Sequence, residues 1–458
     1  MGNPTASADD VTRLLGRVAF GATEADLDAW TGKPYAALVE HLLDVPAIAT
    51  RAPAVDEARR LSLAVDADGR FVRIDDGTDG LDGARGWWLE RMRTTPYPLE
   101  ERMTLLWHGH FATGPGTPYP NQSMLMAQNQ TIRSHALGSF SSLVTAMTID
   151  PAMLYWLNGA ENAPPEPNEN YAREFFELFT LGKSPQVYSE TDIREAARAF
   201  TGWTVDFLGR PSFKLARHDR GRKLVLRRDI SDLGEKEHLA VAEVALAHPV
   251  AARFIAWKLV AGLAYEPVPA NLLARPDPLV RAVADTLRAS SWDIRAALRR
   301  LLLDDRFRAA SPARGQQLVR QPVDVVVSAA KALGVSADGS EQLHLLAEMG
   351  QRLFAPPNVG GWPVEREWFS PSTMIARYDF GLALHRQHIL GSAELALDPL
   401  PPPDDVPAFA RRLGLARVSP TTVAAVRRYL DRRKDAGVDE RESYVLALLL
   451  ASPDWMVM

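Results

Sequence analysis

The sequence predicts a mainly α-helical protein, a single large multi-helical body with one or two short β-hairpin insertions. Apolar residues recur at helical spacing through most of the 458 residues. Strand-like alternation is confined to two short stretches. The content of 46% hydrophobic and 24% charged residues is that of an ordinary globular protein, and the length suffices for a sizeable core.

Helical patterns separated by Gly or Pro fill the first half of the chain. Pro98 suits the first turn of its helix, where its missing N–H is not needed. Thr191 suits an N-cap, because acidic residues follow in the first turn. The helices predicted here are Ala8–Phe20, Glu24–Trp30, Pro34–Leu43, Leu81–Arg93, Pro98–Phe111, Asn121–Leu137, Ser139–Met147, Pro151–Leu157, residues 168–182 and Thr191–Phe200.

The second half continues in the same way. Its predicted helices are Lys236–Ala247, Val250–Leu263, Pro278–Ala289, Ile294–Leu303, Val319–Leu333, Glu341–Leu353, Thr421–Arg433 and Glu440–Leu450. The two hairpin candidates are Leu61–Ile74, around an Asp-Ala-Asp-Gly turn, and Ser212–Asp229, around Asp-Arg-Gly-Arg. The Pro-rich stretch Leu397–Val406 is the best candidate for a linker. We therefore divide the chain into a main helical domain, 1–396, and a connector with C-terminal helices, 397–458, which packs on the same body.

Composition excludes several classes of protein. The net charge is −5 with no basic block, which does not support nucleic-acid binding. The absence of cysteine removes thiolate nucleophiles, disulfides and zinc–thiolate sites. No run of about 18 apolar residues predicts a membrane span, and the N-terminus lacks a secretory leader pattern. As the sequence stands it predicts a cytoplasmic protein, or a periplasmic or extracellular one if a leader was removed.

The segment 168–182 places charge among aromatic residues. Glu174 and Glu177 share one face of the predicted helix, and Arg173 can pair with Glu177 one turn away. Charge near a core must be paired, hydrogen-bonded or bound to a metal. The two carboxylates are therefore either metal ligands, as in helical bundle sites, or members of a salt-bridge ladder.

The sequence Trp-His-Gly-His-Phe at 107–111 supplies two imidazoles. In a continuous helix His108 and His110 point roughly opposite ways, so both reach one metal only if Gly109 ends the helix. The alternative is that one histidine caps the helix and the other bonds a core carbonyl.

Three further features are candidates for a site. His218 and Asp219 lie on the second hairpin, where the histidine is a third metal ligand, a general base or part of a turn. The prolines and glycines of residues 356–362 predict a rigid turn that presents Trp362. Trp362 and Trp368 either pack in the core or line a pocket.

Several of these segments together resemble a bacterial family known as domain of unknown function 1800. The resemblance covers nearly the whole chain and is most specific in Trp-His-x-His-Phe at 107–111 and Asn-Glu-Asn-Tyr-Ala-Arg-Glu at 168–174. It implies no established activity. It implies export for many members and a sulfatase-like partner protein encoded nearby. This chain departs from the family after His218-Asp219, where no Lys-x-x-Leu-Gly follows.

We therefore predict an enzyme whose site forms where the 107–111 turn, the Asn168–Glu177 helix and the His218 hairpin converge. A divalent metal would activate water for hydrolysis, which is slightly favoured over oxidation, on a polar or anionic substrate. The predicted metal ligands are His108, His110, Glu174, Glu177 and His218. The predicted catalytic residues are Glu174, Arg173, His218 and Asp219, with Arg173 and Arg133 orienting the substrate.

Two alternatives stay open. One is a metal-free enzyme in which the carboxylates act as general acid and base on a glycan. The other is a non-catalytic helical scaffold that works with a partner enzyme, its polar segments being buried salt-bridge networks.

Overall fold

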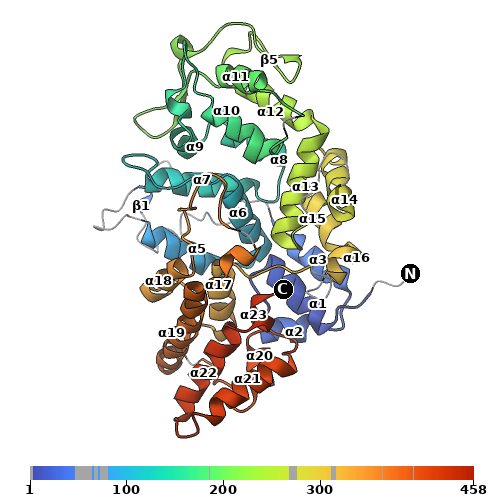
Figure 1. Ribbon diagram of the computed structural model, residues 1–458, viewed down its shortest axis with the longest axis vertical. Coiled ribbons are helices and arrows are strands. Elements are labelled where there is room, and N and C mark those ends of the chain that lie inside the picture. The colour runs from blue at the N-terminus through green and yellow to red at the C-terminus, as the bar shows by residue number, and fades with distance from the viewer. Residues whose placement is uncertain are drawn as a thin grey trace.

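The fold is known from a computed structural model, which describes residues 4–46, 64–65, 71–72, 81–184, 186–267, 276–310, 316–363, 365–395 and 397–458. It is mainly α-helical with short antiparallel hairpins, as the sequence predicts. The molecule is elongated in the view of Figure 1, with α10, α11 and α12 at one end and α20, α21 and α22 at the other.

The helices of the first half follow the predicted pattern closely. Pro98 occupies the first turn of α6. The elements to residue 247 are α1 (Ala8–Val18), α2 (Glu24–Trp30), α3 (Tyr35–Leu43), α5 (Asp82–Thr94), α6 (Pro98–His110), α7 (Gln122–His135), α8 (Phe140–Met147), α9 (Pro151–Trp156), η2 (Gly159–Glu161), α10 (Asn170–Glu174), η3 (Phe175–Thr180), α11 (Glu190–Ala199), η4 (Leu215–Arg217), η5 (Gly234–Lys236) and α12 (Glu237–Ala247).

The second half is helical too. Its elements are α13 (Pro249–Leu263), α14 (Pro278–Ala289), α15 (Ile294–Leu302), α16 (Asp305–Ala309), α17 (Pro322–Leu333), α18 (Ser340–Glu348), η7 (Glu365–Trp368), α19 (Pro371–Leu395), α20 (Val406–Arg412), α21 (Pro420–Asp431), α22 (Val438–Leu450) and α23 (Pro453–Met456). Within the described ranges no single helix is long and apolar enough to cross a bilayer. One pair, Gly234–Ala247 and Pro249–Leu263, meets that test together but is bent by 79°.

Two helix predictions need correction. The N-cap of α11 is Ser189 and not Thr191, because Ser189 and Asp192 form a capping box in which each side chain bonds the other's backbone N–H. Helix α19 was not predicted at all, although it spans 25 residues. Its apolar and polar residues are distributed around the whole helix, so the sequence has no amphipathic stripe to reveal it.

The hairpins differ from the prediction in their pairing. In the first, β1 (Ala64–Val65) pairs with β2 (Phe71–Val72), and the rest of 61–74 lies outside the described residues. The predicted hairpin Ser212–Asp229 is wrong, because its two halves belong to different sheets. Strand β3 (Trp203–Val205) pairs with β4 (Pro211–Phe213), and β5 (Leu224–Val225) pairs with β6 (Arg228–Asp229).

Local turn chemistry explains the actual pairing. The carboxylate of Asp206 accepts hydrogen bonds from the backbone N–H groups of Leu208 and Arg210, and Gly209 adopts a φ of +77°. The chain therefore reverses at 206–210. His218 consequently lies in a connection between two hairpins and not at the turn of one.

The buried side chains form two apolar clusters. The first includes residues of α1, α3, α8 and α13–α16, and the second includes residues of α5, α17, α20 and α22. Helix α6 contributes to both, since Leu99, Met103 and Trp107 belong to the first cluster and Leu105 to the second. Below we call these clusters the first and second cores. Helix α6 lies at their junction.

Candidate functional site

The end of α6 carries both predicted histidine ligands. The helix continues through Gly109 to His110, and the N–H of Phe111 still donates to the carbonyl of Trp107 at 2.8 Å. Because an α-helix turns by about 100° per residue, His108 and His110 project in nearly opposite directions. The break at Gly109 that would bring both rings to one metal is absent.

His108 lies in an aromatic pocket against the second core. Its ring centroid is 5.1 Å from that of Trp88, 5.4 Å from Phe354 and 5.3 Å from Trp362. The side chain is fully buried, and neither ring nitrogen has a hydrogen-bond partner among the described residues. Burial, with a smaller contribution from the charge of Arg133, lowers the pKa of His108 to about 3. The imidazole is therefore neutral at physiological pH.

His110 packs into the first core. Its Nε2 lies 3.0 Å from the carbonyl oxygen of Phe179, and its ring contacts Phe111, Phe140 and Phe254. Burial, aided by the positive charge of Lys258, lowers the pKa of His110 to about 3. His110 thus takes the role of the alternative prediction, in which one of the two histidines bonds a core carbonyl.

The segment 168–182 forms α10 followed by a π-helix, η3. The N–H of Leu181 donates to the carbonyl of Phe176 and the hydroxyl of Thr180 to that of Phe175, so the widened turn satisfies its own backbone. Single π-turns occur frequently at functional sites. The aromatic side chains Phe175, Phe176 and Phe179 are buried, as the sequence predicts.

The charged residues of this segment form a salt-bridge ladder. Arg173 pairs with Glu169 at 3.2 Å, Glu190 at 2.6 Å and Glu177 at 3.9 Å. Glu174 is partly buried, and burial together with the charge of Glu177 raises its pKa.

His218 and Asp219 belong to a different network. His218 bonds the carbonyl oxygen of Thr201 through Nδ1 at 2.9 Å, and its Nε2 lies 3.4 Å from the carboxylate of Glu237. Glu237 also pairs with the buried Lys223 at 2.9 Å. The carboxylate of Asp219 accepts two bonds from Arg198, which hold its pKa at about 2 although burial would raise it.

The predicted site residues are thus distributed over three separate environments. Arg133, the predicted substrate-orienting residue, is fully buried and donates to Glu101 through two nitrogens, at 2.7 and 3.0 Å. Across the described ranges no group of three or more His, Cys, Asp or Glu side chains is placed to hold a metal ion. The metal site stays a prediction of the sequence.

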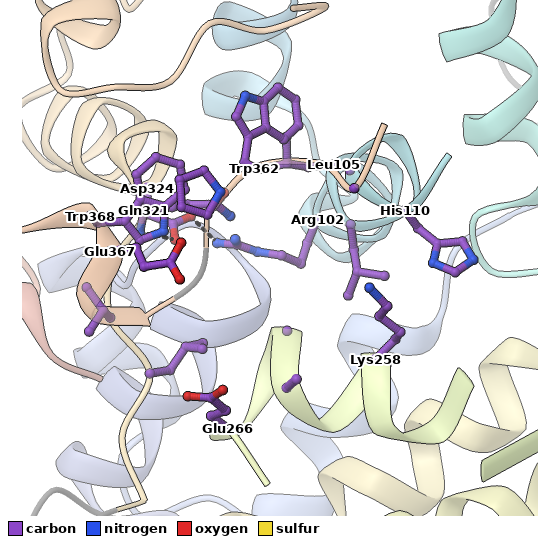
Figure 2. Close-up of a pocket in the computed structure, with 18 of the residues that line it drawn as sticks. Arg102, Leu105, His110, Lys258, Glu266, Gln321, Asp324, Trp362, Glu367 and Trp368 are labelled. Carbon is purple, nitrogen blue, oxygen red and sulfur yellow. Dashed lines mark hydrogen bonds and ion pairs between the residues drawn. The ribbon is translucent and has the colours of Figure 1, made fainter. Parts of the chain in front are cut away.

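A cavity of about 370 Å³ opens beside α6, at the junction of the two cores. Residues of four segments line it: α6, α13, the start of α17 and the stretch 360–368. Figure 2 shows Arg102, Lys258, Asp324, Trp362 and Trp368 around it. Its size is that of a small-molecule site, which typically measures about 300–1,000 Å³.

The α17 wall of this cavity holds a buried ion pair. A terminal nitrogen of Arg102 donates to Asp324, and both side chains are almost fully buried. The Arg102 guanidinium also lies 4.2 Å from the centroid of the Phe20 ring, and its Nε has no partner among the described residues. Arg102 therefore has one buried donor without a partner among the described residues.

Two more buried arginines lie close to Asp324. Burial lowers the pKa of Arg320 and that of Arg377 to about 10, and the charge of Asp324 opposes both shifts. Arg320 donates to the carbonyl of Trp455 at 2.7 Å, and Arg377 contacts the sulfur of Met456 at 3.2 Å. Both side chains stay cationic at neutral pH. Asp324 thus faces three arginines.

Lys258 adds a fourth cation from α13. Its Nζ lies 5.5 Å from the ring centroid of Phe254 and 5.8 Å from that of Trp257. No carboxylate of the described residues forms an ion pair with it, and burial lowers its pKa. In Figure 2 its amine points toward α6, the helix that carries Arg102 and His110.

Sequence reasoning missed most of these residues, although a signal was present. Arg320 and Asp324 flank the start of an otherwise apolar helix, and Lys258 interrupts the apolar stretch 254–264. A charge within a buried segment needs a partner or a ligand, and this holds for these residues as it does for the charges of 168–182. Trp362 and Trp368 do line a cavity, one of the two roles considered for them.

Comparison with known proteins assigns the family but no activity. Neither the curated proteins nor the solved structures contain a significant match. The family model described as "Protein of unknown function (DUF1800)" matches residues 13–457, nearly the whole chain. The protein therefore belongs to the DUF1800 family.

Proposed function

We propose that this protein binds a small organic anion in the cavity between its two cores. The observation that carries the proposal is the charge of the buried walls. Arg102 and Lys258 line the cavity, Arg320 and Arg377 are buried near Asp324, and Asp324 is the buried carboxylate among them. An uncompensated buried charge is unfavourable, so an anionic ligand would neutralise what the protein leaves in excess.

The remaining lining suits the organic part of such a ligand. The tryptophans at 257, 362 and 368 present apolar and aromatic surface around the cavity. Glu266 and Glu367 also line it but are exposed to solvent, so water screens their charge. An anionic head group bound at Arg102 with an apolar part against the rings satisfies both kinds of surface.

Calorimetric titration with matched probes tests the proposal. Benzoate and phenyl phosphate carry the two anionic groups that arginine binds best, benzyl alcohol is their neutral counterpart and benzylamine their cationic one. We expect the better anion to bind at least about tenfold more tightly than benzyl alcohol, because hydrogen bonds to charged groups contribute about 1.5–3 kcal/mol. The stronger of the two anions identifies the head group.

A lysine pair provides the control. Lys258→Gln is expected to weaken binding of the anion by about tenfold, whereas Lys434→Gln, which changes an exposed lysine, leaves it unchanged. Equal binding of anionic and neutral probes, or folded protein that binds none of them, contradicts the proposal.

A further inference from the structure

Lys258 differs from the arginines of the cavity because an amine can act as a nucleophile. We infer that Lys258 forms an imine with the carbonyl group of a 2-oxo acid bound in the cavity. The inference rests on the proposed anion site, and it names the class of ligand. The carboxylate of a 2-oxo acid would lie at Arg102 and its carbonyl carbon at Lys258.

The first argument is the position of the amine. Lys258 lines the cavity from α13, in the wall formed with Trp257 and Gly262. Gly262 packs so closely on α6 that a Cβ there would lie 2.7 Å from a methyl carbon of Leu106. Helix α13 therefore lies against α6 at Gly262, one turn from Lys258. In Figure 2 Lys258 and Arg102 both lie around the cavity, with the guanidinium of Arg102 directed toward Gln321 and Asp324.

The second argument is the lack of a competing partner. By contrast, the buried Lys223 lies 2.9 Å from Glu237 and also donates to two carbonyl oxygens. The faces of Phe254 and Trp257 lie near the nitrogen of Lys258, and no carboxylate of the described residues forms an ion pair with it. An ammonium without a counter-ion in apolar surroundings loses its proton more easily, and burial lowers the pKa of Lys258 accordingly. The uncharged amine is the nucleophilic form.

The reaction needs only the two partners. The lone pair of Nζ adds to the carbonyl carbon, and the carbonyl π electrons move to the oxygen. A proton passes from nitrogen to that oxygen to give a carbinolamine, and a proton from solvent lets the oxygen leave as water. The nitrogen lone pair then forms the C=N bond, and the nitrogen returns its last proton to solvent. The C=N bond replaces the C=O bond, with no change in oxidation state.

Reductive trapping on the full chain tests the inference. Phenylpyruvate, which carries a carboxylate, a carbonyl and an aromatic ring, is incubated with the protein and sodium cyanoborohydride. This reagent reduces imines much faster than ketones, so each trapped imine becomes a stable secondary amine. Peptide mass spectrometry then locates the adduct among the eight lysines of the chain. We expect Lys258 to be labelled more than about tenfold faster than exposed Lys434, because binding holds the carbonyl beside the amine.

Two controls separate this inference from the anion site. Lys258→Arg keeps the positive charge but removes the amine, so it should abolish trapping at that position while benzoate still binds. Excess benzoate should slow trapping in the unmodified protein by occupying the same cavity. Circular dichroism and the unfolding temperature establish that the variant is folded.

The outcomes are distinct. Trapping at Lys258 that benzoate suppresses supports the inference. Benzoate binding without trapping, or labelling spread evenly over surface lysines, overturns the imine and leaves the anion site intact. No binding of benzoate, phenyl phosphate or phenylpyruvate by folded protein overturns both.

Discussion

At the scale of single residues, the charge of Glu101 on α6 is held by three hydrogen-bond partners. Its carboxylate accepts hydrogen bonds from Arg91 at 2.6 Å, Arg133 at 2.7 Å and the indole of Trp88 at 2.9 Å, and the side chain is fully buried. Burial alone would raise the pKa of Glu101, but the two arginines outweigh it and hold the pKa at about 2. This network joins α5, α6 and α7 behind His108.

The substitution Glu101→Gln should therefore destabilise the protein by about 3–5 kcal/mol, because it leaves two arginines facing a neutral group. The pKa of Glu101 is depressed in the folded state, so its stabilising contribution is present above its unfolded pKa of about 4.5 and is lost as the pH falls toward 2. Urea unfolding as a function of pH measures both effects. Glu161→Gln, at an exposed position, is the matched control.

A loss below about 1 kcal/mol for Glu101→Gln, comparable with that of the control, would show that the network contributes little.

At the scale of elements, the end of α6 and the turn 356–362 fit together through two glycines. The turn is closed by hydrogen bonds from the N–H groups of Gly360 and Gly361 to the side chain and backbone oxygens of Asn358. Gly361 has a φ of +94°, and a Cβ at this position would lie 2.3 Å from the carbonyl oxygen of Gly109. The turn thereby places Trp362 against His108 and beside the cavity.

Gly361→Ala should destabilise the protein by more than about 1–3 kcal/mol, since both the left-handed backbone and the close contact oppose a side chain. It should also weaken benzoate binding, because Trp362 must move with the turn. Gly437→Ala is the control, with a φ of −61° and nothing within 4 Å of the added Cβ. Thermal unfolding and calorimetric titration of the two variants are the measurements. Equal stability and affinity would show that the turn adapts without cost.

The sequence predicted elements well where one residue dictates a local conformation. Pro98 begins its helix as expected, and the glycines of 356–362 form the expected turn. It failed where several local turns or several helix caps compete for the same stretch of chain. The carboxylate of Asp206 decides the hairpin at 203–213, and Ser189 outcompetes Thr191 as a cap.

The lining of the cavity could not be predicted from the sequence. Arg102, Lys258 and Asp324 are far apart along the chain, and only the packing of α6 against α13 and α17 brings them to one space. A single sequence contains no information on which buried charges become neighbours. The sequence indicates the kind of residue to seek, a charge among apolar side chains, and in the segment 168–182 such charges form a salt-bridge ladder.

At the scale of the whole molecule, the predicted metal ligands are dispersed while the cavity is central. His108 packs toward the second core and His110 toward the first, and His218 bonds Thr201 beyond α11. Figure 1 places α10 and α11 at one end of the molecule, whereas α6 lies near its middle. Of the predicted metal ligands in the described ranges, His110 lines the cavity, whereas the charge of the proposed anion site comes from Arg102 and Lys258.

Metal removal tests this independence. Protein prepared without a histidine tag and dialysed against EDTA should bind benzoate with an unchanged affinity, because arginine and lysine supply the charge. Elemental analysis before dialysis, with His108→Ala and Glu174→Ala beside it, addresses the metal hypothesis itself. A stoichiometric metal that both folded variants lose, together with loss of benzoate binding after EDTA, would contradict a metal-free anion site.

The aromatic lining of the cavity has a practical consequence. Three of the eleven tryptophans border it, and indole emission responds to the polarity and charge of its surroundings. The protein thus contains its own optical reporter of occupancy. Unlabelled metabolite libraries can be screened against it by intrinsic fluorescence, and replacing Trp257 by phenylalanine would show how much of any signal arises at the cavity.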